Sequence, residues 1–149
     1  MKKFMIMCMM LLATTLTFTA CGDDDDDVNP QEEVNQENYY KYSESTNVPN
    51  FGNYTVIGEA TFANGKATAI AISFVYPKKS YASDDWADYQ EDEDLNISEY
   101  SYDGDRTITW RMGQQSLAYY STLSKEEVCK LIKHIVSESI ADVNEAIGK

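Results

Sequence analysis

The chain has 149 residues, of which 25 are acidic and 12 are Lys or Arg, and its formal net charge at pH 7 is −13. A surface this negative repels phosphate backbones and anionic lipid head groups, which excludes nucleic-acid binding and membrane contact through basic side chains. The length allows one domain with a substantial core and is too short for two of ordinary size.

A secretory leader is predicted at residues 1–20. Lys2 and Lys3 form its cationic start, a predominantly apolar stretch follows, and small residues up to Ala20 precede Cys21. The apolar stretch is shorter than the roughly 20 residues that a transmembrane helix needs. Cleavage before Cys21 would make this cysteine the first residue of the mature chain and the point of attachment of a lipid anchor.

Residues 17–21, Thr-Phe-Thr-Ala-Cys, resemble a lipoprotein cleavage and acylation site, and Gly22 with the aspartates after it resembles the acid-rich export signal of Bacteroidetes-type surface lipoproteins. The resemblance covers about the first 27 residues. It implies acylation of Cys21 and export to the outer face of the outer membrane. The residues of the implied export signal are Asp23, Asp24, Asp25, Asp26 and Asp27. Glycine replaces the serine or lysine common in such signals, so display on the cell exterior and retention on the periplasmic face both stay open.

Removal of the leader changes both the charge and the cysteine content. The leader contains Lys2, Lys3 and no acidic residue, so the mature chain would have a net charge of −15. Cys8 would leave with the leader and Cys21 would be acylated, which leaves Cys129 without a disulfide partner. We therefore expect the fold to depend on packing alone.

Residues 21–50 are predicted to form an acidic, flexible tether, because they are rich in Asp, Asn, Gln, Glu and Ser and contain few aliphatic side chains. Tyr39, Tyr40 and Tyr42 depart from this composition. They either dock on the domain or form an adhesive segment for a ligand, and docking is the simpler interpretation. A single α+β domain is predicted for residues 51–149.

The first predicted hairpin pairs residues 54–63 with residues 66–76. The Asn-Gly dipeptide at 64–65 between them is typical of a two-residue type I′ turn, because both of its residues tolerate positive φ. This register would place Ile57 opposite Ile72.

A second hairpin is predicted from residues 97–102 and 106–112, around an Asp-Gly-Asp sequence. A three-residue loop would place Tyr100 and Tyr102 on the same face as Trp110. We favour this register over that of a two-residue loop because it gathers the aromatic side chains.

The C-terminal part is predicted to contain a short fifth strand at residues 116–121 and a long helix at residues 124–147. Ser124 and Glu127 have the spacing of a capping box, and apolar residues then recur every three or four positions. The predicted fold is therefore α+β, with an antiparallel sheet of four to five strands built from two hairpins and packed by one long C-terminal helix.

The segment 81–96, which joins the two hairpins, is the most plausible functional surface in the sequence. A connection of this length in a compact domain is usually functional or disordered. Two of its aromatic residues, Trp86 and Tyr89, could form a stacking platform for a sugar ring or an anchor in a protein interface, or they could fold back over the sheet edge. The candidate binding residues are Trp86, Tyr89, Asp84, Asp85 and Asp88.

Evidence for a metal site or a catalytic centre is sparse. Asp92 and Asp94 are candidate ligands for Ca²⁺ because calcium prefers carboxylate oxygens, but an EF-hand is excluded by Ile97, which occupies the position of its invariant glycine. The only histidine, His134, lies four residues before Glu138, the spacing of a surface ion pair. No serine-hydrolase elbow, Walker loop or Cys-x-x-Cys pair is present. The sequence therefore predicts neither an enzyme nor any cofactor other than possible Ca²⁺.

Two functional hypotheses follow. In the first, the protein is a lipid-anchored, non-catalytic recognition module of the cell envelope, which binds an unknown glycan or protein at the outer membrane. In the second, it is an inhibitor or immunity-type lipoprotein that blocks a basic enzyme or toxin, because a strongly negative protein is steered towards a basic partner.

Overall fold

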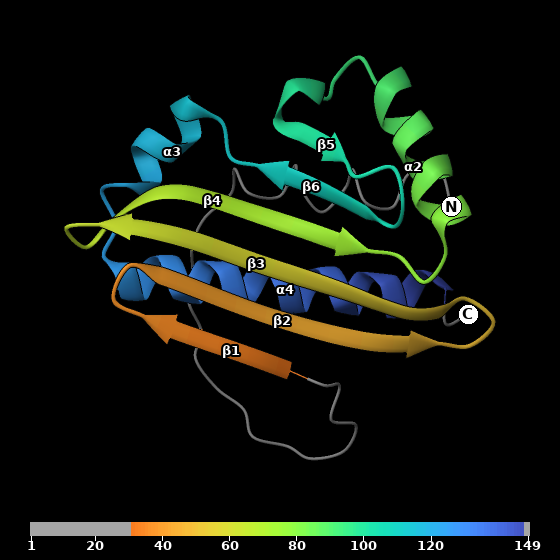
Figure 1. Cartoon of the computed structure of the whole chain (residues 1–149), viewed down its shortest axis with the longest axis horizontal. Coiled ribbons are helices and arrows are strands. Elements are labelled where there is room, and N and C mark those ends of the chain that lie inside the picture. The colour runs from red at the N-terminus through yellow and green to blue at the C-terminus, as the bar shows by residue number, and fades with distance from the viewer. Residues whose placement is uncertain (1–30, 148–149) are drawn as a thin grey trace.

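The computed structural model describes residues 31–147, which fold into a six-stranded sheet and helices (Figure 1). In chain order the elements are β1 (Gln31–Gln36), β2 (Tyr39–Val48), β3 (Gly52–Ala63), β4 (Lys66–Val75), α2 (Lys79–Glu91), the 3-10 turn η2 (Ile97–Glu99), β5 (Tyr100–Tyr102), β6 (Thr107–Arg111), α3 (Gln114–Tyr120) and α4 (Lys125–Ile147). The predicted leader, Cys21 and the aspartates at 23–27 lie outside the described residues.

All neighbouring strands are antiparallel, and their order across the sheet is β1-β2-β3-β4-β6-β5. The long helix α4 lies along one face of the sheet and contacts mainly β2 and β3 (Figure 1). The predicted α+β class is confirmed, although the sheet has six strands where four to five were expected. None of the helices among residues 31–147 is long and apolar enough to cross a membrane.

The prediction of a flexible tether is wrong for residues 31–48, which form the strands β1 and β2. The side chains of β2 alternate between the two faces of the sheet, and Tyr40 and Tyr42 are buried on the face that α4 covers. Polar residues at the intervening positions lower the average hydrophobicity of the segment and conceal this pattern. The folded domain therefore begins at Gln31 rather than at residue 51, and Tyr40 and Tyr42 are core residues.

The first hairpin is confirmed, but its predicted register is wrong beyond the turn. Asn64 has a φ of 52° and Gly65 a φ of 75°, as a type I′ turn requires. A β-bulge two residues from the turn then shifts the pairing by one residue, so that Ile72 lies opposite Gly58 instead of Ile57. A shift of one residue reverses the face of every side chain beyond it.

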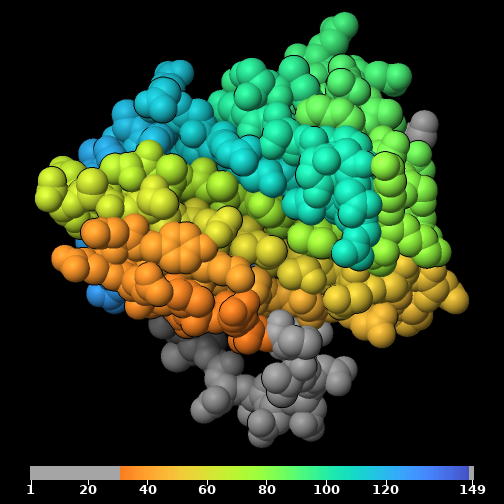
Figure 2. All heavy atoms as spheres, viewed as in Figure 1, coloured from red at the N-terminus to blue at the C-terminus, as the bar shows by residue number. Residues whose placement is uncertain are grey.

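Because of the bulge, the large apolar residues of β4 lie on the same face as the buried residues of β3. This face packs against α4, and among its buried residues are Val56, Ala60, Phe62, Ile70, Ile72 and Phe74. The other face is rich in hydroxyl side chains, several of which pair between strands, as Ser73 and Thr109 do at 2.9 Å. In the view of Figure 2, the residues of the strands themselves form the molecular surface where the sheet faces the viewer.

The second hairpin places Tyr100 and Tyr102 on the face of Trp110, as favoured, but its register is shifted by two residues from that of a three-residue loop at 103–105. Tyr100 lies opposite Trp110 and Tyr102 opposite Ile108. Its first strand is shorter than predicted, because residues 97–99 form the turn η2.

Residues 116–121 lie mainly in the helix α3 and not in the predicted fifth strand. The sequence places Leu117 and Tyr119 at alternate positions, which suggested a strand, but Leu117 is buried whereas Tyr119 is 59% exposed. The two side chains therefore do not share a buried face, because residues two positions apart on a helix point in nearly opposite directions.

The predicted C-terminal helix is confirmed as α4, and so is its capping box. The backbone N–H of Ser124 donates to the Glu127 carboxylate at 2.8 Å, and the N–H of Glu127 donates to Ser124 Oγ at 3.2 Å. The buried residues of the helix are Val128, Cys129, Leu131, Ile132, Val136, Ser139, Ile140 and Val143.

The connection between the hairpins is largely the helix α2 and not the long loop that its acidic composition suggested. Ala82 and Tyr89 are buried and Trp86 is half-buried, and this spacing of four and three residues lies on one side of a helix. The apolar stripe contains few residues, so the many acidic residues around it made the segment resemble a loop in the sequence.

Candidate functional site

The aromatic residues predicted to bind a ligand at α2 pack on the protein itself. The Tyr89 ring makes an edge-on contact with Tyr100 at 5.3 Å between centroids, and the Trp86 ring lies 6.0 Å from that of Tyr102. Tyr89 is only 4% exposed. The two side chains therefore fold back over β5 at the edge of the sheet, which was the alternative to an open stacking platform.

The three candidate aspartates of α2 differ in environment. Asp84 is exposed and Asp88 is half-buried. Asp85 accepts a hydrogen bond from the Tyr76 hydroxyl at 2.8 Å, and its partial burial raises the pKa of its carboxyl. Asp85 therefore has a structural partner, and the surface that α2 presents to a second molecule consists mainly of exposed acids.

The candidate Ca²⁺ ligands lie in a turn just after α2. The backbone N–H of Asp94 donates to Asp92 Oδ1 at 2.9 Å. Within residues 31–147, no three His, Cys, Asp or Glu side chains are grouped so that they could hold a metal ion. His134 forms the predicted ion pair with Glu138, at 3.3 Å.

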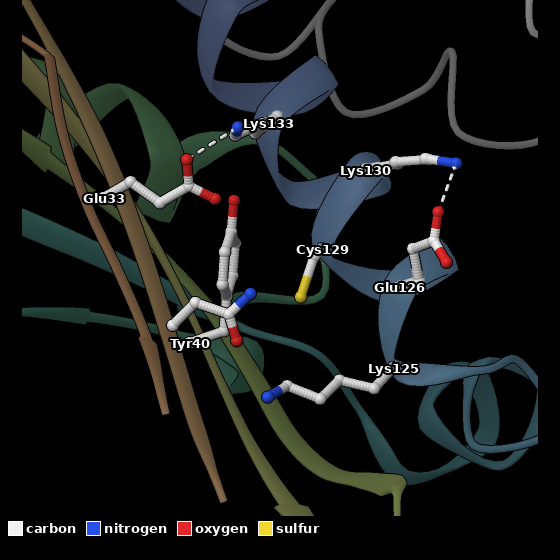
Figure 3. A pocket seen from close by; sticks show the side chains of 8 residues that line it. Glu33, Tyr40, Lys125, Glu126, Cys129, Lys130 and Lys133 are labelled. Carbon is white, nitrogen blue, oxygen red and sulfur yellow. Dashed lines mark ion pairs between the residues drawn. The ribbon is translucent and has the colours of Figure 1, made fainter. Parts of the chain in front are cut away.

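A different site is formed between the edge of the sheet and the first half of α4 (Figure 3). It is a pocket of about 430 Å³. Its walls come from β1, β2 and α4, and the residues that line it are Glu33, Asn35, Tyr40, Lys125, Glu126, Cys129, Lys130 and Lys133. The volume lies within the range of roughly 300–1,000 Å³ that is common for small-molecule sites.

Strand register and helical periodicity together create this pocket. Asn35 pairs with Tyr40, so Asn35 and Glu33 lie on the side of β1 that faces α4. On α4, Lys125, Cys129 and Lys133 recur every four residues and thus lie on one side of the helix. The pocket therefore exists only because the polar segment around residue 33 is an edge strand.

The three lysines of the pocket have different partners. Lys133 forms an ion pair with Glu33 at 2.7 Å, and Lys130 forms one with Glu126 at 2.8 Å (Figure 3). Lys125 differs, because it has no carboxylate partner in the part of the chain that the structure describes.

The ammonium of Lys125 is instead held by uncharged groups. It donates to the backbone carbonyl of Gln36 at 2.5 Å and lies 5.5 Å from the centre of the Phe62 ring. Its positive charge is therefore not neutralised by an ion pair within the described domain.

Tyr40 is the most buried side chain of the pocket, with 0% exposure. Its hydroxyl lies beside the carboxylate of Glu33, although the two make no hydrogen bond of ordinary distance and angle. Burial raises the pKa of Tyr40 far above its usual value, and the nearby Glu33 carboxylate raises it further. Tyr40 and Glu33 therefore interact with each other at one wall of the pocket.

Cys129, at the back of the pocket, is 9% exposed. Burial raises the pKa of its thiol. The protonated thiol is a weak nucleophile, so Cys129 serves as a small apolar wall and not as a reactive centre.

Sequence reasoning did not find this pocket, because Glu33, Asn35 and Tyr40 were assigned to the tether. The usable signal was the alternation of Tyr40 and Tyr42 with polar residues, which predicts a strand. The periodic Lys125 and Lys133 around Cys129 gave a second signal on the helix.

Comparison with protein-family models, with curated proteins and with solved structures returns no match for this chain. The function is therefore argued from the sequence and from the geometry of the pocket.

Proposed function

We propose that this protein is a lipid-anchored protein of the bacterial cell envelope that acts by binding, without catalysis, and that the pocket between β1 and α4 is its binding site. The observation that carries the binding proposal is Lys125, which lines a pocket of about 430 Å³ and has no carboxylate partner among the described residues. The domain begins at Gln31, ten residues after the proposed acylation site Cys21, so only a short segment separates it from the lipid.

The anchor is tested by metabolic labelling with an alkyne analogue of palmitate. The wild-type protein and Cys8→Ala, which alters a cysteine inside the proposed leader, are expected to be labelled equally. Cys21→Ala is expected to remain unlabelled. Labelling that survives Cys21→Ala would refute the proposed anchor, and protease treatment of intact cells would distinguish the outer from the periplasmic face.

The pocket is tested with a pair of variants on adjacent residues of β1. Asn35 lines the pocket, whereas Gln36 pairs with Tyr39 and lies on the opposite face of the same strand. The full lipidated protein is incubated in detergent with an envelope extract, and retained molecules are identified by native mass spectrometry. We expect a ligand that wild type and Gln36→Trp retain and Asn35→Trp does not. Equal retention by both variants would exclude this pocket.

The second candidate, an inhibitor or immunity-type lipoprotein, is favoured by the charge of α2 and the turn after it. No Lys or Arg occurs between residues 80 and 105, and Asp84, Glu91, Glu93 and Asp94 are exposed. Such a surface would accelerate association with a basic protein. Capture of one stoichiometric basic protein, lost when these four acids are changed to their amides and kept by Asn35→Trp, would favour this candidate over the first.

A further inference from the structure

We infer that the pocket is a receptor for a carboxylate group, which the Lys125 ammonium binds with the Asn35 amide as a neutral partner. This inference names the ligand class for the pocket on which the proposed function rests.

The first argument is the concentration of positive charge at the pocket. Residues 31–147 contain nine Lys and Arg residues, and three of them line this one cavity. Two carboxylates, Glu33 and Glu126, also line it, so the lining has a net charge of +1. In a chain with a net charge of −13 this is a local reversal of sign, and it favours an anion.

The second argument is the difference between the three lysines. Lys130 and Lys133 already bind carboxylates of this chain at 2.8 and 2.7 Å, so their charges are neutralised within the domain. Lys125 has only a backbone carbonyl and an aromatic ring as partners. A charge-assisted bond from Lys125 to a carboxylate would be stronger than the neutral contact that it makes now.

The third argument concerns the charge and size of the ligand. One carboxylate carries a single negative charge, which balances a lining of +1, whereas a phosphate monoester carries up to two. The cavity of about 430 Å³ is larger than a carboxylate group. The remainder of the ligand is therefore a body small enough to fill the rest of this cavity.

Cys129 provides a direct measurement of occupancy, because it lines the pocket and is the only cysteine among residues 31–147. The full lipidated protein in detergent is treated with iodoacetamide at alkaline pH, where part of the buried thiol is deprotonated and reacts slowly, and alkylation of Cys129 is followed by mass spectrometry of its peptide. Acetate, glucuronate, glucose and inorganic phosphate are compared at constant ionic strength. Glucuronate and glucose differ in one carboxylate and form a matched pair.

We expect acetate and glucuronate to slow the alkylation of Cys129 several-fold, and glucose to leave the rate unchanged. Lys125→Gln should abolish this protection, whereas Lys79→Gln, which alters an exposed lysine at the start of α2, should retain it. Circular dichroism of each variant confirms that the fold is intact. Equal effects of glucuronate and glucose, no effect of either carboxylate, or full protection in Lys125→Gln would overturn the inference. Protection by phosphate at lower concentrations than by both carboxylates would overturn it as well.

Failure of the inferred ligand class can be distinguished from failure of the proposed function. A natural ligand retained through Asn35 without any protection by carboxylates would refute the ligand class and leave the function standing. Protection by carboxylates with no pocket-dependent ligand in the envelope would refute the function and leave the chemistry of the pocket intact.

Discussion

Gly58 of β3 lies directly under Ile132 of α4, so close that a Cβ atom at position 58 would overlap the Ile132 side chain. The same Cβ would lie 3.0 Å from Val136 Cγ2. The helix therefore approaches the sheet at a point where β3 has no side chain. The distance between the two layers depends on this glycine.

We predict that Gly58→Ala lowers the free energy of unfolding by about 1–3 kcal/mol, because the added methyl group overpacks the interface between β3 and α4. Urea denaturation measures the change. Ala69→Val, which adds carbon atoms at an exposed position of β4, should change the same quantity by less than about 0.5 kcal/mol. Equal effects of the two variants would contradict the close approach described here.

A second prediction compares two buried tyrosines of β2. The Tyr42 hydroxyl donates to Glu44 at 2.9 Å, whereas that of Tyr40 lies beside Glu33 without a hydrogen bond of ordinary distance and angle. Without ligand, Tyr42→Phe should lower the free energy of unfolding by about 1 kcal/mol, whereas Tyr40→Phe should leave it unchanged or raise it by a similar amount. Thermal and urea unfolding of both variants test this. A loss of stability in Tyr40→Phe as large as that in Tyr42→Phe would show that the Tyr40 hydroxyl is satisfied.

The third prediction concerns the pH dependence of stability at Asp85. Burial raises the pKa of this carboxyl in the folded state, so folding favours its protonated form. As the pH rises from about 3 through the folded-state pKa, the unfolded chain releases this proton more readily, and wild type loses stability relative to Asp85→Asn. Asparagine is uncharged and can still accept the hydrogen bond from Tyr76.

Urea unfolding of wild type and Asp85→Asn at about pH 3 and pH 7 measures this linkage. We expect the variant to gain stability relative to wild type at the higher pH. The prediction would be wrong if the difference in free energy of unfolding between the two proteins were the same at both pH values, or if it shifted in favour of wild type at pH 7.

The fourth prediction separates packing from binding at α2. Tyr89 is buried against Tyr100, so Tyr89→Ala should lower the free energy of unfolding by about 3 kcal/mol through the cavity that it leaves. Asp84→Ala, at an exposed site in the same helix, should change it by less than about 0.5 kcal/mol. If Tyr89→Ala kept its stability and lost a ligand, the original hypothesis of an aromatic binding surface would be supported instead.

The sequence predicted those elements whose signals are local. The Asn64-Gly65 turn and the Ser124–Glu127 capping box each involve residues within a few positions of one another, and both are present. Strand β2 was missed because alternate positions are polar, which reduces its average hydrophobicity. Helix α2 was missed because its buried stripe is short and most of its other residues are polar or acidic.

The candidate site could not be predicted in the same way, because it joins residues far apart in the chain. Glu33 and Lys133 are separated by 100 positions and meet only when β1 joins the sheet beside α4. The register error beyond the first turn has a similar origin. The bulge near Thr61 brings the large apolar residues of β4 onto the buried face of the sheet, and a turn dipeptide does not specify such an irregularity.

The two outermost strands of the sheet are short, with six residues in β1 and three in β5. β1 also carries the charged side chains of Glu32 and Glu33 along this edge of the sheet. Edge strands that are short or charged pair poorly with strands of other molecules, which protects the protein against aggregation. A protein crowded on a bilayer, as proposed for this one, would gain from such protection.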